Sequence, residues 1–486
     1  MRLRSPPSIS RIIAHPKFPG TSGSHSFSSL PAKMADNTTP QFNTYKTRYI
    51  DIGINLADPI FRGRYHGKSK HPDDLKGVVS RAVEVGCTKL IVTGSSFKSS
   101  RDALKLAQEF PNTVYSTAGI HPCSSSIFSP SHHKHHDESQ SEGEDGQPEE
   151  HTPACGPDPT KPILDGEGVD LARSEVIVKD LKEFITSAPK NQLVAFGEFG
   201  LDYDRLHYAS KEVQLHSFAV QLKLAASLTP QLPLFLHSRA AHEDFVRLLK
   251  DAFGDKLERL EKGGVVHSFT GTVEEMKELM ELGLYIGING CSFKTAENCA
   301  VVKEVSLDRL MIETDGPWCE VRPTHEGWKY LVEWEEARKK REEEELRKKE
   351  EEEEAKKKAE EEEARKAKEE EEKEKEALRK ATDGVETLKV EGENNDAEPA
   401  RRQRRPKKAQ PQQPQQKKNQ KKESEVPDRF KVVKKEKWEE GAMVKGRNEP
   451  CTIERIARIV AGIKGVSVEE VCEAAWANTV KVFNVE

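Results

Sequence analysis

The chain has 486 residues, which exceeds the usual size of one domain and predicts either one large domain with appendages or two domains. Its 83 acidic and 77 basic residues leave a formal net charge of only −6, so overall charge predicts no strongly charged partner and any basic surface must be local. Charged residues make up 33% of the chain, which excludes a uniformly globular protein, and the eight scattered cysteines lack the spacing of a structural zinc site and favour a reducing compartment.

Residues 1–46 are expected to form a disordered tail or a targeting segment. The stretch 1–35 contains basic residues and serines but no acid, which is the composition of a mitochondrial transit peptide. Its prolines interrupt an amphipathic helix, and Met34 could replace Met1 as the start. We therefore expect a protein of the cytoplasm or nucleus, with the mitochondrion as the alternative. No apolar run is long enough to cross a membrane.

From Tyr49 onward, short apolar runs alternate with helical patterns. The predicted strands are residues 49–55, 89–94, 113–120, 193–198, 232–237, 263–267, 284–288 and 309–314. Near-continuous apolar strands separated by helices predict a parallel sheet that is buried on both faces. About eight such units predict a (β/α)8 barrel, with a doubly wound open sheet as the alternative. We assign residues 47–332 and 428–486 to this barrel, and the last 36 or so residues predict its closing helices.

Two insertions interrupt this pattern. Residues 123–170 are rich in Ser, Pro, Gly and acid, which predicts a disordered loop; its histidines at 132, 133, 135 and 136 could hold a metal, but a solvated polar tract is preferred. Residues 333–427 begin with many i,i+4 Glu/Lys pairs and no apolar seam, which predicts an isolated exposed helix. The basic tract 401–422 that follows is either a nuclear import signal or nucleic-acid tether, or a linker without a partner.

Four predicted strands end in side chains that bind metals. The apolar runs finish at Glu198, His237, His267 and Asp315. Because the carboxyl ends of barrel strands meet at one mouth, we expect these two imidazoles and two carboxylates to lie together. Carboxylates and imidazoles are ligands for divalent metals, so the sequence predicts a metal site there.

At this point the chain resembles the TatD family of metal-dependent deoxyribonucleases, in a eukaryotic form with large charged insertions. The matching stretches, in family order, are DIGINLADPIFRG (51–63), AGIHP (118–122), GEFGLDYDR (197–205), LHSR (236–239), HSFTG (267–271), ETDGPW (313–318) and RNEP (447–450). They span nearly the whole expected barrel. Each stretch alone is a weak match, but together they are specific.

The resemblance implies a 3′–5′ exodeoxyribonuclease that uses divalent ions, most simply two Mg²⁺, with Mn²⁺ or Zn²⁺ as alternatives. It implies Glu198 as the carboxylate shared between the ions, His237 and His267 on one ion and Asp315 on the other. The catalytic residues would be Glu198, Asp315 and His121, with His121 near the scissile phosphate. Two ions about 3.5–4 Å apart would generate hydroxide and neutralise the phosphoryl charge.

One departure from the family pattern concerns the first strand. Many members carry a His-x-His pair there, whereas this chain has Gly53 and Asn55. Asp51 and Asn55 are therefore candidates for the metal site or its surroundings, and Mg²⁺, which keeps waters, is favoured over Zn²⁺.

Four residues that follow strand ends are candidates for binding DNA: Arg239, Arg205, Lys294 and Trp318. Two other functions stay open. The same site could hydrolyse the ester of a misacylated tRNA, or the barrel could be a scaffold for an interaction protein that acts through its charged insertion.

Overall fold

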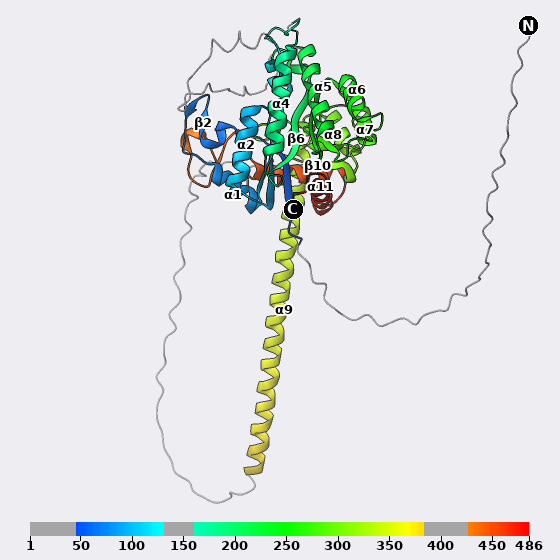
Figure 1. Ribbon diagram of the computed structural model, residues 1–486. Coiled ribbons are helices and arrows are strands. Elements are labelled where there is room, and N and C mark those ends of the chain that lie inside the picture. Colours follow the sequence, from blue (N-terminus) through cyan, green and yellow to red (C-terminus); the bar gives the residue numbers. More distant parts are fainter. Residues whose placement is uncertain (1–44, 131–159, 167, 383–425, 486) are drawn as a thin grey trace, which may run out of the picture. The chain divides into compact units, whose positions relative to one another are not determined.

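The computed structural model describes residues 45–130, 160–166, 168–382 and 426–485 (Figure 1). Its main sheet has eight strands in the order β1-β4-β5-β6-β7-β8-β9-β10, and every neighbouring pair is parallel. These strands are β1 (Tyr49–Ile54), β4 (Cys87–Val92), β5 (Val114–Ala118), β6 (Leu193–Asp202), β7 (Leu234–Arg239), β8 (Gly264–Val266), β9 (Tyr285–Ile288) and β10 (Leu310–Ile312). The predicted strands are confirmed in number and order.

Backbone hydrogen bonds join the first strand to the segment that follows the last. Asp315 N donates to Gly53 O at 2.8 Å, and Asn55 N donates to Gly316 O at 2.8 Å. The carboxylate of Asp51 also accepts from the backbone N of Thr314 at 3.0 Å. The sheet is thus nearly closed on itself, which confirms the (β/α)8 barrel and not the doubly wound sheet.

Helices lie outside the strands (Figure 1). They are α1 (Leu75–Glu84), α2 (Phe97–Glu109), α4 (Leu171–Ser187), α5 (Lys211–Ser227), α6 (His242–Phe253), α7 (Val273–Glu281), α8 (Ala296–Glu304), α9 (Trp328–Thr382), α10 (Ile453–Lys464) and α11 (Val468–Phe483). Helix α6 shows why they form: Phe245, Leu249 and Phe253 recur on one buried face, and the helix ends at Gly254 with φ 99°. A Ser or Thr with a glutamate three residues later caps α7 and α11.

In the described part of the chain, four short strands lie outside the barrel sheet. The strands β2 (Arg64–Tyr65) and β3 (Lys68–Ser69) form a hairpin after the 3-10 helix η1 (Pro59–Arg62), and β11 (Val432–Val433) pairs with β12 (Met443–Val444). The other short 3-10 helices are η2 (Pro122–Phe128), η3 (Tyr203–Arg205), η4 (Gly290–Phe293), η5 (Leu307–Arg309), η6 (Lys435–Lys437) and η7 (Pro450–Thr452).

The hydrophobic core joins the strands to the C-terminal end of the chain. Buried residues of β1, β4, β6, β7 and β10 pack in one cluster with Val482, Phe483 and Val485. The segment after the long insertion is therefore part of the barrel's core, and the barrel cannot be complete without it.

The two expected insertions are described only in part. Residues 123–128 belong to η2, whose Phe128 is fully buried, while residues 131–159 lie outside the described residues. Helix α9 covers the Glu/Lys-rich stretch, and residues 339–380 are all exposed. Ion pairs four residues apart run along it, such as Lys357 with Glu353 at 2.8 Å.

The chain re-enters the barrel through a buried ion network. Arg447 contacts Asp74 at 2.5 Å and Glu449 at 2.7 Å, while Arg81 contacts Glu449 at 2.8 Å and Asp74 at 3.0 Å. All four side chains are at most 4% exposed, so each charge depends on its partners. The network ties the RNEP stretch to α1.

Three sequence predictions fall on residues that the structure does not describe: the segment 1–44, the histidines at 132–136 and the basic tract 401–422. Among the residues it does describe, no helix is both long and apolar enough to cross a membrane.

The carboxyl group of Asp51 should make stability depend on pH. Burial raises the pKa of Asp51 from 3.8 to about 8, although hydrogen bonds from Thr314 and Gly53 oppose the shift. Because Asp51 has a higher pKa in the folded chain than in the unfolded chain, its protonated carboxyl group stabilises the fold. This contribution to stability is complete below the unfolded pKa of Asp51 and is lost as pH rises through its folded pKa. Asp51→Asn keeps an oxygen for the two backbone N–H groups but cannot ionise.

Urea unfolding of wild type and Asp51→Asn at about pH 5 and about pH 9 measures this effect. Wild type should lose roughly 2–4 kcal/mol more stability than the variant over that interval. Parallel pH profiles for the two proteins would contradict this assignment.

Candidate metal centre

A bulge in β6 presents Glu198 to the barrel mouth. Gly197 pairs with Phe235 and Phe199 with Leu236, so Glu198 is an extra residue in the strand. A Cβ on Gly197 would lie 2.0 Å from Phe235 O, and one on Gly200 would lie 1.8 Å from His237 O. The two glycines therefore let β7 approach on both sides of the bulge. The prediction that β6 ends at Glu198 is wrong, because the strand resumes after the bulge and continues to Asp202.

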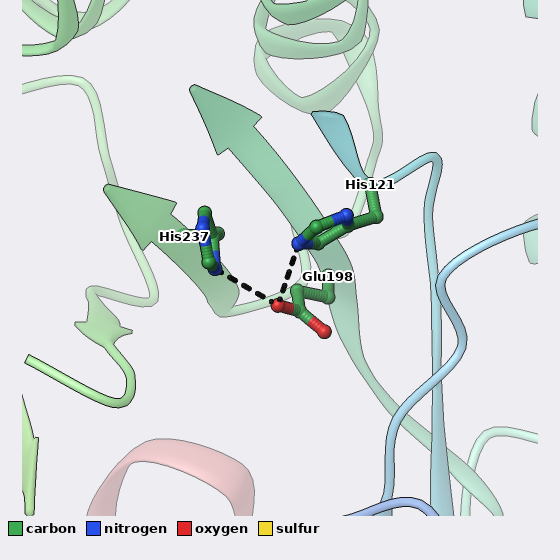
Figure 2. Close-up of side chains that lie close together, drawn as sticks. All are labelled: His121, Glu198 and His237. Carbon is green, nitrogen blue, oxygen red and sulfur yellow. Dashed lines mark hydrogen bonds and ion pairs between the residues drawn. The ribbon is translucent and has the colours of Figure 1, made fainter. Parts of the chain in front are cut away.

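Three imidazoles converge on one oxygen of Glu198. Its Oε1 lies 2.6 Å from His267 Nε2, 3.1 Å from His237 Nδ1 and 3.3 Å from His121 Nε2. Figure 2 shows His121, on the segment after β5, and His237, on β7, pointing at this carboxylate from two sides. All four side chains are buried. Ligand atoms of His121, Glu198 and His237 all lie within 4.8 Å of one another.

The charges of this group are strongly coupled. Burial would raise the pKa of Glu198, but His267 and His121 outweigh it and hold that pKa well below its ordinary value. Burial would lower the pKa of His267, but Glu198 and then Glu313 raise it well above the ordinary value. Burial lowers the pKa of His121 despite its contact with Glu198. The site thus holds an ionised carboxylate and attracts positive charge.

Two further carboxylates orient the histidines from behind. Asp202 Oδ2 lies 2.9 Å from His237 Nε2 and also contacts Arg205. Glu313 Oε2 lies 3.5 Å from His267 Nδ1, and neither of these buried atoms has a hydrogen-bond partner among the described residues. Carboxylates in this position fix the tautomer of metal-binding histidines. Neither residue was among the predicted site residues, although each lies in a stretch that carries the family resemblance.

His121 differs from the other two histidines. Its Nδ1 accepts a hydrogen bond from Cys123 N at 3.1 Å, so in the neutral ring the proton is on Nε2, which faces Glu198. His121 is therefore a hydrogen-bond donor into the site. In His237 and His267, by contrast, the outer ring nitrogen faces a carboxylate. A carboxylate there holds the ring proton on the outer nitrogen, which leaves the lone pair of the inner nitrogen for a metal.

Asp315 lies at the same mouth but is held separately. Its Oδ1 accepts from Asn55 Nδ2 at 3.0 Å, and its Oδ2 accepts from Cys319 Sγ at 3.2 Å. Thr93 in turn donates to Asn55 Oδ1 at 2.6 Å. Burial raises the pKa of Asp315 to about 7, with His267 opposing this and Glu313 and Glu198 adding to it.

The absence of the His-x-His pair from the first strand has a structural reason. A Cβ on Gly53 would lie 2.2 Å from Glu313 Oε2, so the Glu313 carboxylate occupies the space that a side chain at position 53 would need. Asn55 contacts Asp315. Asp51 does not join this group, because Thr314 and Gly53 occupy its carboxylate.

The four candidate DNA-binding residues differ in their surroundings. Trp318 is 43% exposed beside Asp315, and Lys294 is exposed at the end of η4. Arg239 lines a cavity of about 220 Å³ together with Asp204, Ser238 and Phe269. Arg205, by contrast, contacts Asp202 behind His237.

The donor set fits a divalent cation. Without a metal, the extra proton favoured on His267 supplies the positive charge between Glu198 and His237. A divalent cation would compensate the same carboxylate charge, and the ligand atoms of His121, Glu198 and His237 lie close enough together to hold one.

Comparisons with known proteins support the resemblance. The family described as TatD related DNase matches residues 50–380. Deoxyribonuclease Tat-D of Schizosaccharomyces pombe is 34% identical over 437 residues, which cover 90% of this chain and 96% of that protein. The 3′-5′ ssDNA/RNA exonuclease TatD of Citrobacter rodentium is 32% identical over 272 residues, which cover 55% of this chain and 78% of that protein.

A solved structure agrees with this assignment. The crystal structure of an uncharacterized amidohydrolase from Saccharomyces cerevisiae superposes with a TM-score of 0.60 at 28% identity and covers 90% of this chain and 100% of the other. Fold, family match and a full-length relative therefore agree, and the chain belongs to the TatD family of DNase-related proteins.

Proposed function

We propose that this chain is a divalent-metal-dependent deoxyribonuclease that removes nucleotides from the 3′ end of DNA. The observation that carries the proposal is the buried carboxylate of Glu198 at the meeting point of three imidazoles. The bacterial relative named a 3′-5′ ssDNA/RNA exonuclease supports the direction of attack. The fungal relative named a deoxyribonuclease supports DNA as the substrate.

The metal ligands in this proposal are Glu198, His237 and His267, with Asp315 for a second ion. When bound, a divalent ion lowers the pKa of a water molecule and neutralises negative charge on the phosphoryl oxygens. We favour Mg²⁺ because it prefers oxygen ligands. On the Asp315 side of the site, the side chains of Asp315 and Asn55 offer oxygen atoms, and no histidine hydrogen-bonds to Asp315 among the described residues.

Two residues would move protons. Asp315 would accept a proton from water through its ionised carboxylate. His121 carries its proton on the nitrogen that faces the site, so it can donate to a phosphate oxygen or to the leaving alkoxide. Asn55 keeps Asp315 oriented.

DNA would be held at the mouth by Arg239, Lys294 and Trp318. The two cations can contact phosphates, and the exposed ring of Trp318 can stack on an unpaired base. Arg205 is better suited to positioning His237 through Asp202. Binding of long DNA by the tract 401–422 remains part of the proposal.

The test is nucleotide release from single-stranded oligonucleotides labelled at the 5′ or the 3′ end, with Mg²⁺ and with EDTA. A 3′–5′ enzyme releases the 3′ label at once and gives a shortening ladder from the 5′-labelled strand. Glu198→Gln should lower activity by at least about 100-fold, and EDTA should abolish it. Glu278→Gln is the matched control, because Glu278 also contacts a histidine, His242, at 2.9 Å, but on helix α7. Full activity of Glu198→Gln would contradict the proposal, as would a folded, metal-loaded wild type without activity.

Histidine substitutions separate ligands from the proton donor. His237→Ala should weaken Mn²⁺ binding at least about tenfold, because it removes a ligand. His121→Ala should change Mn²⁺ affinity less than about threefold while it lowers kcat about 100-fold or more, because it removes only a donor. Calorimetric titration with Mn²⁺ and single-turnover kinetics distinguish the two effects. Equal loss of Mn²⁺ affinity in both variants would mean that His121 is also a ligand.

Asp202 should act through His237. Asp202→Asn keeps the size of the side chain but removes the carboxylate behind the ring, so Mn²⁺ affinity should fall about 10- to 100-fold. Asp204→Asn, two residues along the chain, is the control, and its Mn²⁺ affinity should equal that of wild type. Unchanged affinity in Asp202→Asn would show that Asp202 only stabilises the fold.

A further inference from the structure

Two thiols lie side by side at the barrel mouth. Cys291 Sγ and Cys319 Sγ are 2.7 Å apart, and both cysteines are free. Cys291 belongs to η4, directly after β9, and Cys319 lies in the segment after β10. The strands β9 and β10 are neighbours in the sheet, so the barrel itself brings the two sulfur atoms together.

This thiol pair is connected to the proposed metal centre. Cys319 donates its S–H to Asp315 Oδ2 at 3.2 Å, and Trp318 N closes the turn between them by donating to Asp315 O at 3.0 Å. Asp315 has only one other side-chain contact described, from Asn55 to Oδ1. A change at Cys319 therefore acts directly on the oxygen that Cys319 contacts.

The surroundings favour oxidation of the pair. The neighbouring Cys319 side chain, and then Lys294 and Arg239, lower the pKa of Cys291, and the thiolate is the form that reacts with peroxides. Cys291 is buried but contacts Cys319, which is partly exposed, so small oxidants reach the pair from the Cys319 side. A disulfide bond is about 2.05 Å long, so the sulfur atoms need to approach by well under 1 Å.

We propose that Cys291 and Cys319 form a reversible oxidation site that controls the proposed metal centre. The Cys291 thiolate attacks one oxygen of hydrogen peroxide, the O–O bond breaks, a sulfenic acid forms, and the departing hydroxide takes up the proton that the Cys291 thiol released to give the first water. Cys319 sulfur then attacks the Cys291 sulfur, the S–O bond breaks, and hydroxide leaves as water with the Cys319 proton. Two thiols and hydrogen peroxide thus give one disulfide and two waters, and a cellular dithiol reverses the step.

Oxidation removes the S–H donor of Asp315. The Oδ2 atom loses its hydrogen bond, and the turn that carries Asp315 and Trp318 is pulled toward the end of β9. The effect on activity rests on the proposed function, whereas the formation of the disulfide does not.

The experiment uses the full chain, reduced with a dithiol and then treated with hydrogen peroxide. Peptide mapping by mass spectrometry without reduction should find a Cys291–Cys319 cross-link. Nuclease activity should fall about tenfold, Mn²⁺ affinity should fall in parallel, and dithiol should restore both. Cys291→Ser keeps the contact between Cys319 and Asp315 and should be insensitive to peroxide. Cys299→Ser, which removes a free thiol on α8, should respond like wild type.

The outcomes separate the two proposals. Absence of the cross-linked peptide overturns the oxidation site, whatever the activity does. A complete cross-link with unchanged activity and Mn²⁺ affinity overturns its control of the metal centre. If reduced wild type has no nuclease activity, the proposed function fails, and the peptide map and the Mn²⁺ titration still decide the oxidation site.

Discussion

The structure depends on one buried negative charge. Glu198 cannot be solvated where it lies, so its carboxylate is stable only because imidazoles surround Oε1 and attract it electrostatically. The same arrangement forces a positive charge into the site, on His267 when no metal is present. A pocket that favours positive charge is well suited to exchange a proton for a divalent ion. The need to neutralise Glu198 thus links the stability of the barrel mouth to its chemistry.

The rest of the barrel keeps these groups in place. The β6 bulge turns Glu198 into the mouth, and the glycines beside it admit the neighbouring strand. Closure between β1 and the segment after β10 positions Asp315, which Asn55 then orients. Asn448, which lies after the long insertion, donates to Thr314 O at 2.9 Å and to Trp318 O at 2.8 Å. The re-entry segment therefore supports the same turn.

Much of the fold and part of the site follow from the sequence. Apolar runs give the strands and their order, and the side chains that end them identify Glu198, His237 and His267, because parallel strands bring their carboxyl ends together. The roles of Asp202 and Glu313 could not be predicted, since they depend on which way each side chain faces. For Asp202, the bulge at Glu198 also changes the alternation along β6. Asp51 was a candidate for the metal site or its surroundings, and Arg205 was a candidate for binding DNA. Their actual partners, Thr314 and Asp202, come from contacts between strands or across a turn that periodicity does not reveal.

Anomalous diffraction from a crystal soaked in Mn²⁺ tests the central claim most directly, because it locates the ion without reference to activity. The account predicts a peak in contact with Glu198, His237 Nδ1 and His267 Nε2, with Asp202 and Glu313 remaining behind the two rings. His121 should lie near the ion without binding it. A peak elsewhere, or none in a fully soaked crystal with an intact Glu198 site, would contradict the account.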